Sequence, residues 1–217
     1  MDISVIQNFE AFLIAITILT LTPGLDTALV IRNSSRGGFS DGFLTSLGIC
    51  LGLFVHATFS AVGISAILAQ SAQLFSLVKM IGAGYLIWLG VMTLKGLVTG
   101  KSGGLNTNMV VSSTPLDAKR SLREGFLSNV LNPKTAVFYL AFLPQFINPE
   151  GSAFFQSCLM AAIHFVIAMI WQCGLAGVLT KAKSLLQSAR FTRWMEGTTG
   201  AVLVVLGIKL LIEKPQV

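Results

Sequence analysis

Long apolar runs with almost no charge constrain this chain more than any other feature of its sequence. Between Gly42 and Leu94 the only formally charged residue is Lys79, and between Gly151 and Thr180 there is none. A membrane-spanning helix needs roughly 20 mostly apolar residues. Six segments meet this requirement: 5–31, 43–69, 74–96, 125–147, 153–180 and 194–212. The sequence therefore predicts an all-α integral membrane protein with six transmembrane helices.

The charge content supports a lipid environment. Charged residues make up 11% of the chain, whereas a typical soluble domain has about 25%, and charges are costly in hydrocarbon. The net charge of +6 does not indicate a nucleic-acid partner, because the basic residues lie in short connections and form no stripe. The first ten residues contain Asp2 and Glu10 but no basic residue, unlike a secretory signal peptide.

The basic residues also predict the orientation in the membrane. Eleven of the 15 lysines and arginines lie in the connections after the first, third and fifth apolar segments. They are Arg32, Arg36, Lys95, Lys101, Lys119, Arg120, Arg123, Lys181, Lys183, Arg190 and Arg193. Loops retained in the cytoplasm are enriched in such residues. These three connections are therefore expected in the cytoplasm and both termini outside.

The two halves of the chain resemble each other. Leu21-Thr22-Pro23 matches Leu131-Asn132-Pro133, and the mid-span His56 matches His164. Because each half has three predicted spans, the second half would enter the membrane in the opposite sense, as in the inverted repeats of secondary transporters. We expect a first repeat over 1–97, a cytoplasmic linker over 98–120 and a second repeat over 121–217.

Proline interrupts the first and fourth apolar segments at Pro23 and Pro133. Proline removes a backbone donor and opens a helix. In hydrocarbon the freed groups need partners, so such breaks usually line a cavity. Gly24 adds flexibility to the first break. Two ordinary kinks are the plain alternative, but the repeat and the charge beside each proline favour a functional site.

Asp26 and Lys134 are the charges beside these breaks. An ionised side chain within the membrane usually faces a partner or a wet cavity. We hypothesise that the two neutralise each other or bind a zwitterion, with Lys134 attracting its carboxylate and Asp26 an ammonium group or a transported proton. The alternatives are a structural ion pair, or contact between Asp26 and Arg32. Thr22 and Asn132 supply polar groups around the site.

The two histidines and a glycine pair leave alternatives open. Near neutral pH a histidine can shuttle protons, so His56 and His164 are candidates for proton coupling. Interhelical hydrogen bonding is the favoured explanation for each histidine taken singly, and their symmetric placement keeps proton coupling as a hypothesis. Gly48 and Gly52 form a G-x-x-x-G pattern, which indicates close helix packing within the chain or in a homo-oligomer.

Several motifs give the chain a resemblance to the LysE/RhtB family of bacterial amino-acid exporters. They are Leu21–Gly24, Gly38–Gly42, Gly82–Gly90, Gly125-Phe126 through Asn132-Pro133-Lys134, and Phe142–Phe146. The resemblance covers nearly the whole chain and implies export of amino acids or close derivatives across the cytoplasmic membrane, driven by protons and without a cofactor. The family's motif residues correspond here to Pro23, Gly24, Asn132, Pro133 and Lys134.

Other functions fit the sequence less well. A metal or inorganic-ion exporter of the same superfamily is the main alternative, but it would need clustered histidines, cysteines or carboxylates. A thiol-disulfide electron carrier would need cysteines beside the breaks, and Cys50, Cys158 and Cys173 lie elsewhere. No hydrolase or metalloprotease motif indicates an enzyme.

Overall fold

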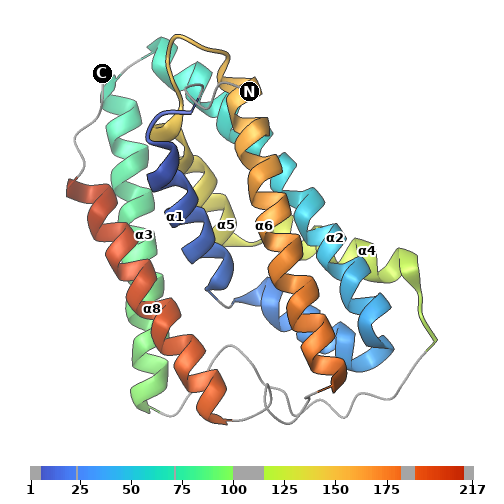
Figure 1. Ribbon diagram of the computed structural model, residues 1–217. Coiled ribbons are helices and arrows are strands. Elements are labelled where there is room, and N and C mark those ends of the chain that lie inside the picture. The colour runs from blue at the N-terminus through green and yellow to red at the C-terminus, as the bar shows by residue number, and fades with distance from the viewer. Residues whose placement is uncertain (1–5, 23, 71, 100–114, 182–188, 213–217) are drawn as a thin grey trace.

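The computed structural model describes residues 6–22, 24–70, 72–99, 115–181 and 189–212 (Figure 1). Its elements are α1 (Phe9–Leu21), α2 (Leu25–Gln70), α3 (Ala72–Thr99), α4 (Ala118–Val130), α5 (Pro133–Val137), the π-helix η2 (Phe138–Phe142), the 3₁₀-helix η3 (Leu143–Phe146), α6 (Ala153–Lys181) and α8 (Ala189–Ile212). Within these ranges the fold is all helical, apart from one isolated bridge between Ile6 and Ile147. The predicted fold class is confirmed at this level.

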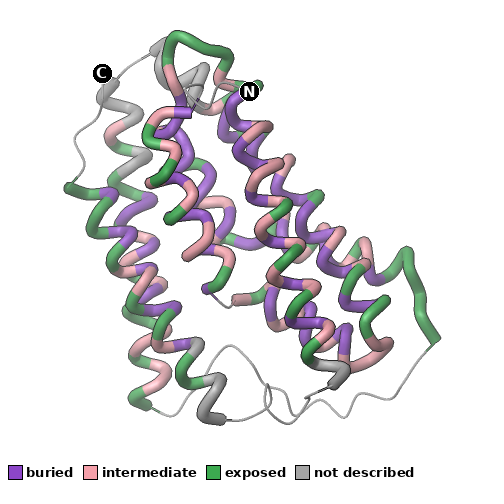
Figure 2. Tube along the Cα trace, in the orientation of Figure 1, coloured by how far each residue is buried: buried purple, intermediate pink, exposed green. Residues whose placement is uncertain are grey.

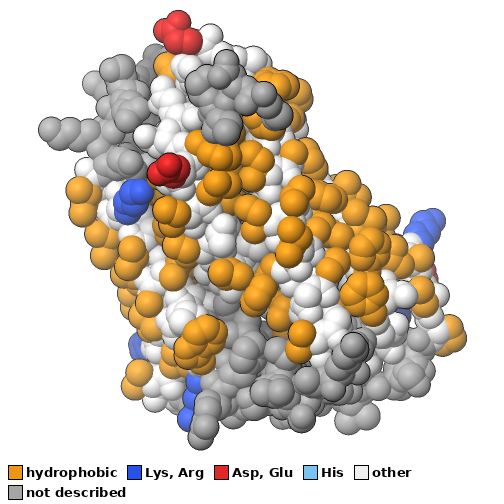
Figure 3. Space-filling view, in the orientation of Figure 1, with side chains coloured by type: hydrophobic (Ala, Val, Ile, Leu, Met, Phe, Trp, Pro, Cys, Tyr) orange, Lys and Arg blue, Asp and Glu red, His pale blue; other side chains and the backbone are white. Residues whose placement is uncertain are grey.

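Three of the described helices are long and apolar enough to cross a membrane, and they lie within α2, α3 and α6. Large apolar side chains are exposed on them, including Trp88 on α3 and Ile170 on α6. Exposed positions recur along the helices (Figure 2), and apolar side chains cover much of the visible surface (Figure 3). Soluble monomers rarely expose apolar patches of this extent. A membrane environment explains them, and the count of six spans stays a prediction.

The turn between the first two predicted spans lies inside the predicted connection, residues 32–42. It is confined to Gly37 and Gly38, and the rest of the connection continues α2 on both sides. Gly38 has φ 73° and ψ −162°, a conformation that glycine adopts without steric cost. The turn therefore needs no separate loop. The fourth predicted span, 125–147, is likewise divided, because α4 begins earlier at Ala118 and is followed by α5, η2 and η3.

Glycines allow the closest helix crossings. A β-carbon at Gly48 of α2 would clash with the Leu122 carbonyl of α4, and one at Gly125 of α4 would clash with the Thr45 carbonyl of α2. The G-x-x-x-G pattern thus serves contacts within the chain. Helices α3 and α8 run side by side at the opposite edge of the bundle (Figure 1). There a β-carbon at Gly90 of α3 would clash in the same way with the Gly200 carbonyl of α8.

Helix α1 and the segment after α4 lie at the centre of the bundle (Figure 1). The rings of Phe12 and Phe146 meet edge to face at 5.5 Å, and the backbone N–H of Gln7 donates to the Phe146 carbonyl at 2.9 Å. The start of α1 and the end of α8 lie toward one end of the bundle, while the α2 turn and the ends of α3 and α6 lie toward the other.

The linker predicted over 98–120 lies mostly outside the described residues, which omit 100–114. Its two edges are helical, because α3 continues to Thr99 and α4 begins at Ala118. The division into two repeats stays a prediction.

Candidate functional site

Two helix breaks with matching backbone conformation form the site. Thr22, between α1 and α2, has φ −70° and ψ 109°, and Asn132, between α4 and α5, has φ −77° and ψ 109°. A following proline disfavours helical geometry and pushes the preceding residue into this extended region. Pro133 then occupies the first turn of α5, where its missing N–H costs nothing. Pro23 itself lies outside the described residues.

Asp26 reaches from the first turn of α2 to the end of α4. Its carboxylate accepts hydrogen bonds from Ser128 Oγ at 2.8 Å, Asn129 Nδ2 at 2.9 Å and Asn132 Nδ2 at 3.0 Å. A carboxylate in the first turn of a helix is also stabilised by the helix dipole. The first break is thereby tied to the second.

Lys134 reaches back in the opposite direction, from the first turn of α5 to the end of α1. Its Nζ donates to the Thr22 carbonyl at 2.8 Å and lies 3.5 Å from the Leu19 carbonyl. Helix C-termini leave such carbonyls without intrahelical partners and favour cations. Among the described residues Asp26 and Lys134 form no ion pair within 4.0 Å. The direct pair considered from the sequence is therefore not present.

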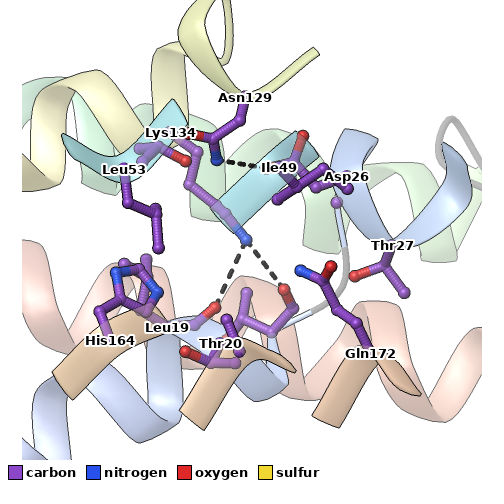
Figure 4. A pocket seen from close by; sticks show the side chains of 14 residues that line it. Leu19, Thr20, Asp26, Thr27, Ile49, Leu53, Asn129, Lys134, His164 and Gln172 are labelled. Atoms are coloured by element: carbon purple, nitrogen blue, oxygen red, sulfur yellow. Dashed lines mark hydrogen bonds between the residues drawn. The ribbon is translucent and has the colours of Figure 1, made fainter. Parts of the chain in front are cut away.

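A cavity lies between the two breaks and α6 (Figure 4). The empty space between its lining atoms, part of it open to solvent, is about 410 Å³. It is lined by Leu19, Thr20, Thr22, Gly24, Asp26, Thr27, Ile49, Leu53, Asn129, Lys134, Thr135, His164, Ala168 and Gln172. Leu19, Ile49, Leu53 and Ala168 are aliphatic, and the other lining residues apart from Gly24 have polar or charged side chains. Small-molecule sites usually combine apolar walls with a few converging polar groups.

Most of the residues that the sequence predicts for the site lie close together. Thr22, Gly24, Asp26, Lys134 and His164 line the cavity. Asn132 contacts Asp26 from the second break, and its Oδ1 caps α5 by accepting from the Lys134 backbone N–H at 3.0 Å. Pro133 begins α5, while His56 is not among the lining residues.

Gln172 is a cavity residue that the sequence reasoning missed. It is 6% exposed, and its Oε1 has no hydrogen-bond partner among the described residues. His164, Ala168 and Gln172 follow one another at four-residue steps on α6, so they share one helix face. A polar pair at this spacing in an otherwise uncharged apolar run is the signal that could have identified Gln172.

The rings of His56 and His164 both lie beside the ring of Tyr139, a residue that sequence reasoning also missed. His56 Nε2 lies 2.9 Å from the Asn129 carbonyl, and His164 Nδ1 lies 3.0 Å from the Tyr139 hydroxyl. Ring centroids are 5.8 Å apart between His56 and Tyr139 and 5.9 Å between Tyr139 and His164. Both histidines thus make the interhelical hydrogen bonds considered from the sequence.

A second polar cluster joins α2 to α4 near the α2 turn. Arg36 makes a bidentate contact with buried Asp41, at 2.8 and 3.0 Å. Glu124 accepts from Arg32 and from Arg120, each at 2.8 Å. Arg32 therefore does not bind Asp26, which was the alternative considered from the sequence. Arg36 and Arg120 entered the sequence analysis only as indicators of orientation, and Asp41 and Glu124 were not singled out there.

The electrostatics of this cluster keep Glu124 ionised. Burial raises the pKa of Glu124, but hydrogen bonds from Arg120 and Asn33 and the charges of Arg32 and Arg36 outweigh it and lower the pKa to about 2. The cluster is an ion network between two helices that the sequence assigns to different halves.

Comparison with known proteins gives a family match over most of the chain. The model described as LysE type translocator matches residues 17–214. The uncharacterized membrane protein YrhP of Bacillus subtilis (strain 168) is 33% identical over 205 residues, covering 94% of this chain and 98% of that protein. No solved structure matches.

Two further relatives have names that state a transported compound. A homoserine/homoserine lactone efflux protein of Salmonella typhimurium is 24% identical, covering 92% of this chain and 94% of that protein. A leucine efflux protein of Klebsiella pneumoniae is 30% identical over 154 residues, covering 69% of this chain and 70% of that protein.

Proposed function

Because this chain belongs to the LysE type translocator family, a family of membrane transporters, we propose that it exports amino acids or close derivatives from the bacterial cytoplasm. Export proceeds in exchange for protons and by alternating access across the cytoplasmic membrane. The amino-acid efflux named for two relatives supports the substrate class.

The single observation that most supports this proposal is the reciprocal contact between the two helix breaks. Asp26 of the first break binds three side chains at the second, and Lys134 of the second binds a carbonyl at the first. Transporters commonly bind substrate where paired discontinuous helices meet near the membrane midplane. The cavity between the breaks is the transport site in this proposal, with Thr22, Gly24, Asp26, Asn132 and Lys134 around it and Pro23 and Pro133 opening the helices.

The proposed architecture is six spanning helices in two inverted repeats. The near-identical backbone angles of Thr22 and Asn132 support it, as does the pairing of α3 with α8, the third helix of each half. The basic connections would face the cytoplasm and both termini the outside. If a reporter that works only in the cytoplasm were active when fused to the C-terminus, that orientation would be contradicted.

Efflux from loaded cells tests the function. Cells expressing the protein are loaded with labelled L-leucine, L-homoserine, L-threonine or L-lysine, and the rate of loss is compared with cells carrying an empty vector. We expect faster loss of at least one compound, collapse of that difference when the proton gradient is dissipated, and an efflux about tenfold slower in Asp26→Asn. The exposed Glu150→Gln is the matched control. No preferential efflux of any amino acid or derivative would contradict the proposal.

A further inference from the structure

The Lys134 ammonium occupies a site that fits the ammonium group of an amino acid equally well. We propose that the carbonyls of Leu19 and Thr22 are the subsite for the substrate's α-ammonium group, and that Lys134 fills this subsite whenever substrate is absent. The inference rests on the proposed export function and assigns a part of its site. It differs from the hypothesis drawn from the sequence, in which Lys134 binds the substrate carboxylate.

The subsite has the chemistry that a primary ammonium requires. An ammonium group has three donors and no acceptor, and the end of α1 offers carbonyl oxygens that already bind Lys134 Nζ at 2.8 and 3.5 Å. The negative end of the helix dipole adds attraction for a cation. Gly24 lets the ammonium approach closely, because a β-carbon there would lie 3.3 Å from Nζ.

Gln172 provides an independent sign that the cavity is made for a ligand. Its Oε1 is buried and unpartnered among the described residues, although buried polar groups are normally hydrogen-bonded. Figure 4 shows its amide pointing from α6 into the cavity, with the nitrogen on the side of the α1 carbonyls and the oxygen on the side of Thr27. This oxygen is free to accept a hydrogen bond from a bound substrate.

Competition for one cation site would couple export to protons. For the substrate ammonium to bind, the Lys134 ammonium must leave the carbonyls. Two like charges in one small cavity repel strongly, so Lys134 leaves in its neutral form. Its N–H bond breaks and the proton passes to cytoplasmic water. After the substrate leaves outward, a proton from outside re-forms the N–H bond, and the ammonium returns to the carbonyls.

The other titratable groups lining the cavity are Asp26 from α2 and His164 from α6. Asp26 is held by three side-chain donors of α4 and the second break, and His164 is hydrogen-bonded to Tyr139. The only ionisable side chain of α1 is Glu10, in its first turn and far along the helix from Thr22. Lys134 is therefore the group whose proton is displaced directly by a bound cation.

The test uses purified protein in nanodiscs and the amino acid exported fastest in the efflux experiment. Each amino acid is compared with its decarboxylated amine and its deaminated acid; for L-leucine these are 3-methylbutylamine and 4-methylpentanoate. We expect the amine to bind and the acid to bind at least about tenfold more weakly than the amino acid. Binding at neutral pH releases about one proton per molecule, measured by calorimetry in buffers of different ionisation enthalpy.

Variants of Lys134 give a second, separate readout. Lys134→Gln should still bind the amino acid but release no proton, so that proteoliposomes exchange the amino acid without accumulating it along a pH gradient. Lys134→Arg should keep the fold and lose binding, because its charge does not leave by deprotonation. The exposed Lys209→Gln is the matched control and should behave as wild type.

Three outcomes would overturn the inference. They are preferential binding of the deaminated acid, absence of proton release by the wild type, or loss of binding in a folded Lys134→Gln. If Lys134→Gln does not fold, the inference is still tested on the wild type, by its affinities for the amine and the acid and by its proton release. Efflux without these signatures leaves the proposed function standing and this inference wrong, whereas absence of any efflux contradicts the proposed function itself.

Discussion

Asn132 donates a hydrogen bond from Nδ2 to the Asp26 carboxylate at 3.0 Å, and so joins the two broken helices through a single side chain. The Oδ1 atom of Asn132 simultaneously accepts the Lys134 backbone N–H at 3.0 Å and caps α5. One amide therefore fixes the direction in which α5 starts and the position of a charge on the other half of the chain.

Replacing Asn132 by alanine should destabilise the protein and abolish efflux. Loss of a helix cap costs about 1 kcal/mol, and loss of a hydrogen bond to a charged group costs about 1.5–3 kcal/mol. Asn132→Asp should restore the cap but set a second carboxylate against Asp26, so efflux stays low while part of the stability returns. Thermal unfolding in detergent and efflux from loaded cells measure the two effects. The exposed neighbour Leu131→Ala serves as control. Wild-type efflux in Asn132→Ala would contradict the role of this link.

Alanine should have opposite effects at two helical glycines. At Gly48 the new methyl group meets the backbone of α4, and overpacking of this kind costs about 1–3 kcal/mol. At Gly84 a β-carbon meets nothing within 4 Å, so the better helix propensity of alanine should raise stability by up to about 1 kcal/mol. Thermal unfolding of Gly48→Ala and Gly84→Ala in the same detergent provides the comparison. Equal shifts for both would show that the α2–α4 crossing is not as close as described.

Local chemistry made the two breaks predictable from the sequence. Proline restricts its own backbone and disfavours helical geometry in the residue before it, so breaks at Thr22 and Asn132 were expected from the sequence. It was predictable that the charges beside the breaks would have polar partners, because uncompensated charge in hydrocarbon is costly. Which partner each charge contacts was not predictable, because those contacts depend on how helices distant in sequence are arranged.

Features that depend on packing escaped the sequence analysis. Arg32 and Arg36 were expected in a connection between spans, yet α2 is helical on both sides of its turn at Gly37 and Gly38. Gln172 and Tyr139 are ordinary residue types in apolar runs, and only the neighbouring helices make them part of the site or its surroundings. The network around Glu124 went unnoticed because charges near the ends of spans also serve solubility and orientation.

Neutralising Glu124 should weaken the α2–α4 network in a pH-dependent way. The pKa of Glu124 is lowered to about 2 in the folded protein, from an ordinary value of 4.5. A depressed carboxyl pKa adds stability that is complete above the unfolded pKa and is lost as the pH falls through the folded pKa. Glu124→Gln should therefore be less stable than wild type at pH 7 and at pH 5. The difference should shrink between about pH 4.5 and pH 2.

Thermal unfolding across this pH range measures the effect of Glu124→Gln, with Glu150→Gln as the matched control on an exposed loop residue. A constant difference between wild type and Glu124→Gln down to pH 2 would mean that the charge of Glu124 does not stabilise the network.

Removing both histidines without removing their hydrogen bonds should leave proton-driven efflux intact. Glutamine places its amide near the position of Nε2, so His56→Gln can keep the contact with the Asn129 carbonyl. Asparagine places its amide near Nδ1, so His164→Asn can keep the contact with the Tyr139 hydroxyl. If Lys134 exchanges the transported proton, the double variant should export along a pH gradient at nearly the wild-type rate. Loss of gradient-driven efflux in a folded double variant that still exchanges amino acid would instead assign the coupling to a histidine, because neither replacement side chain can take up a proton near neutral pH.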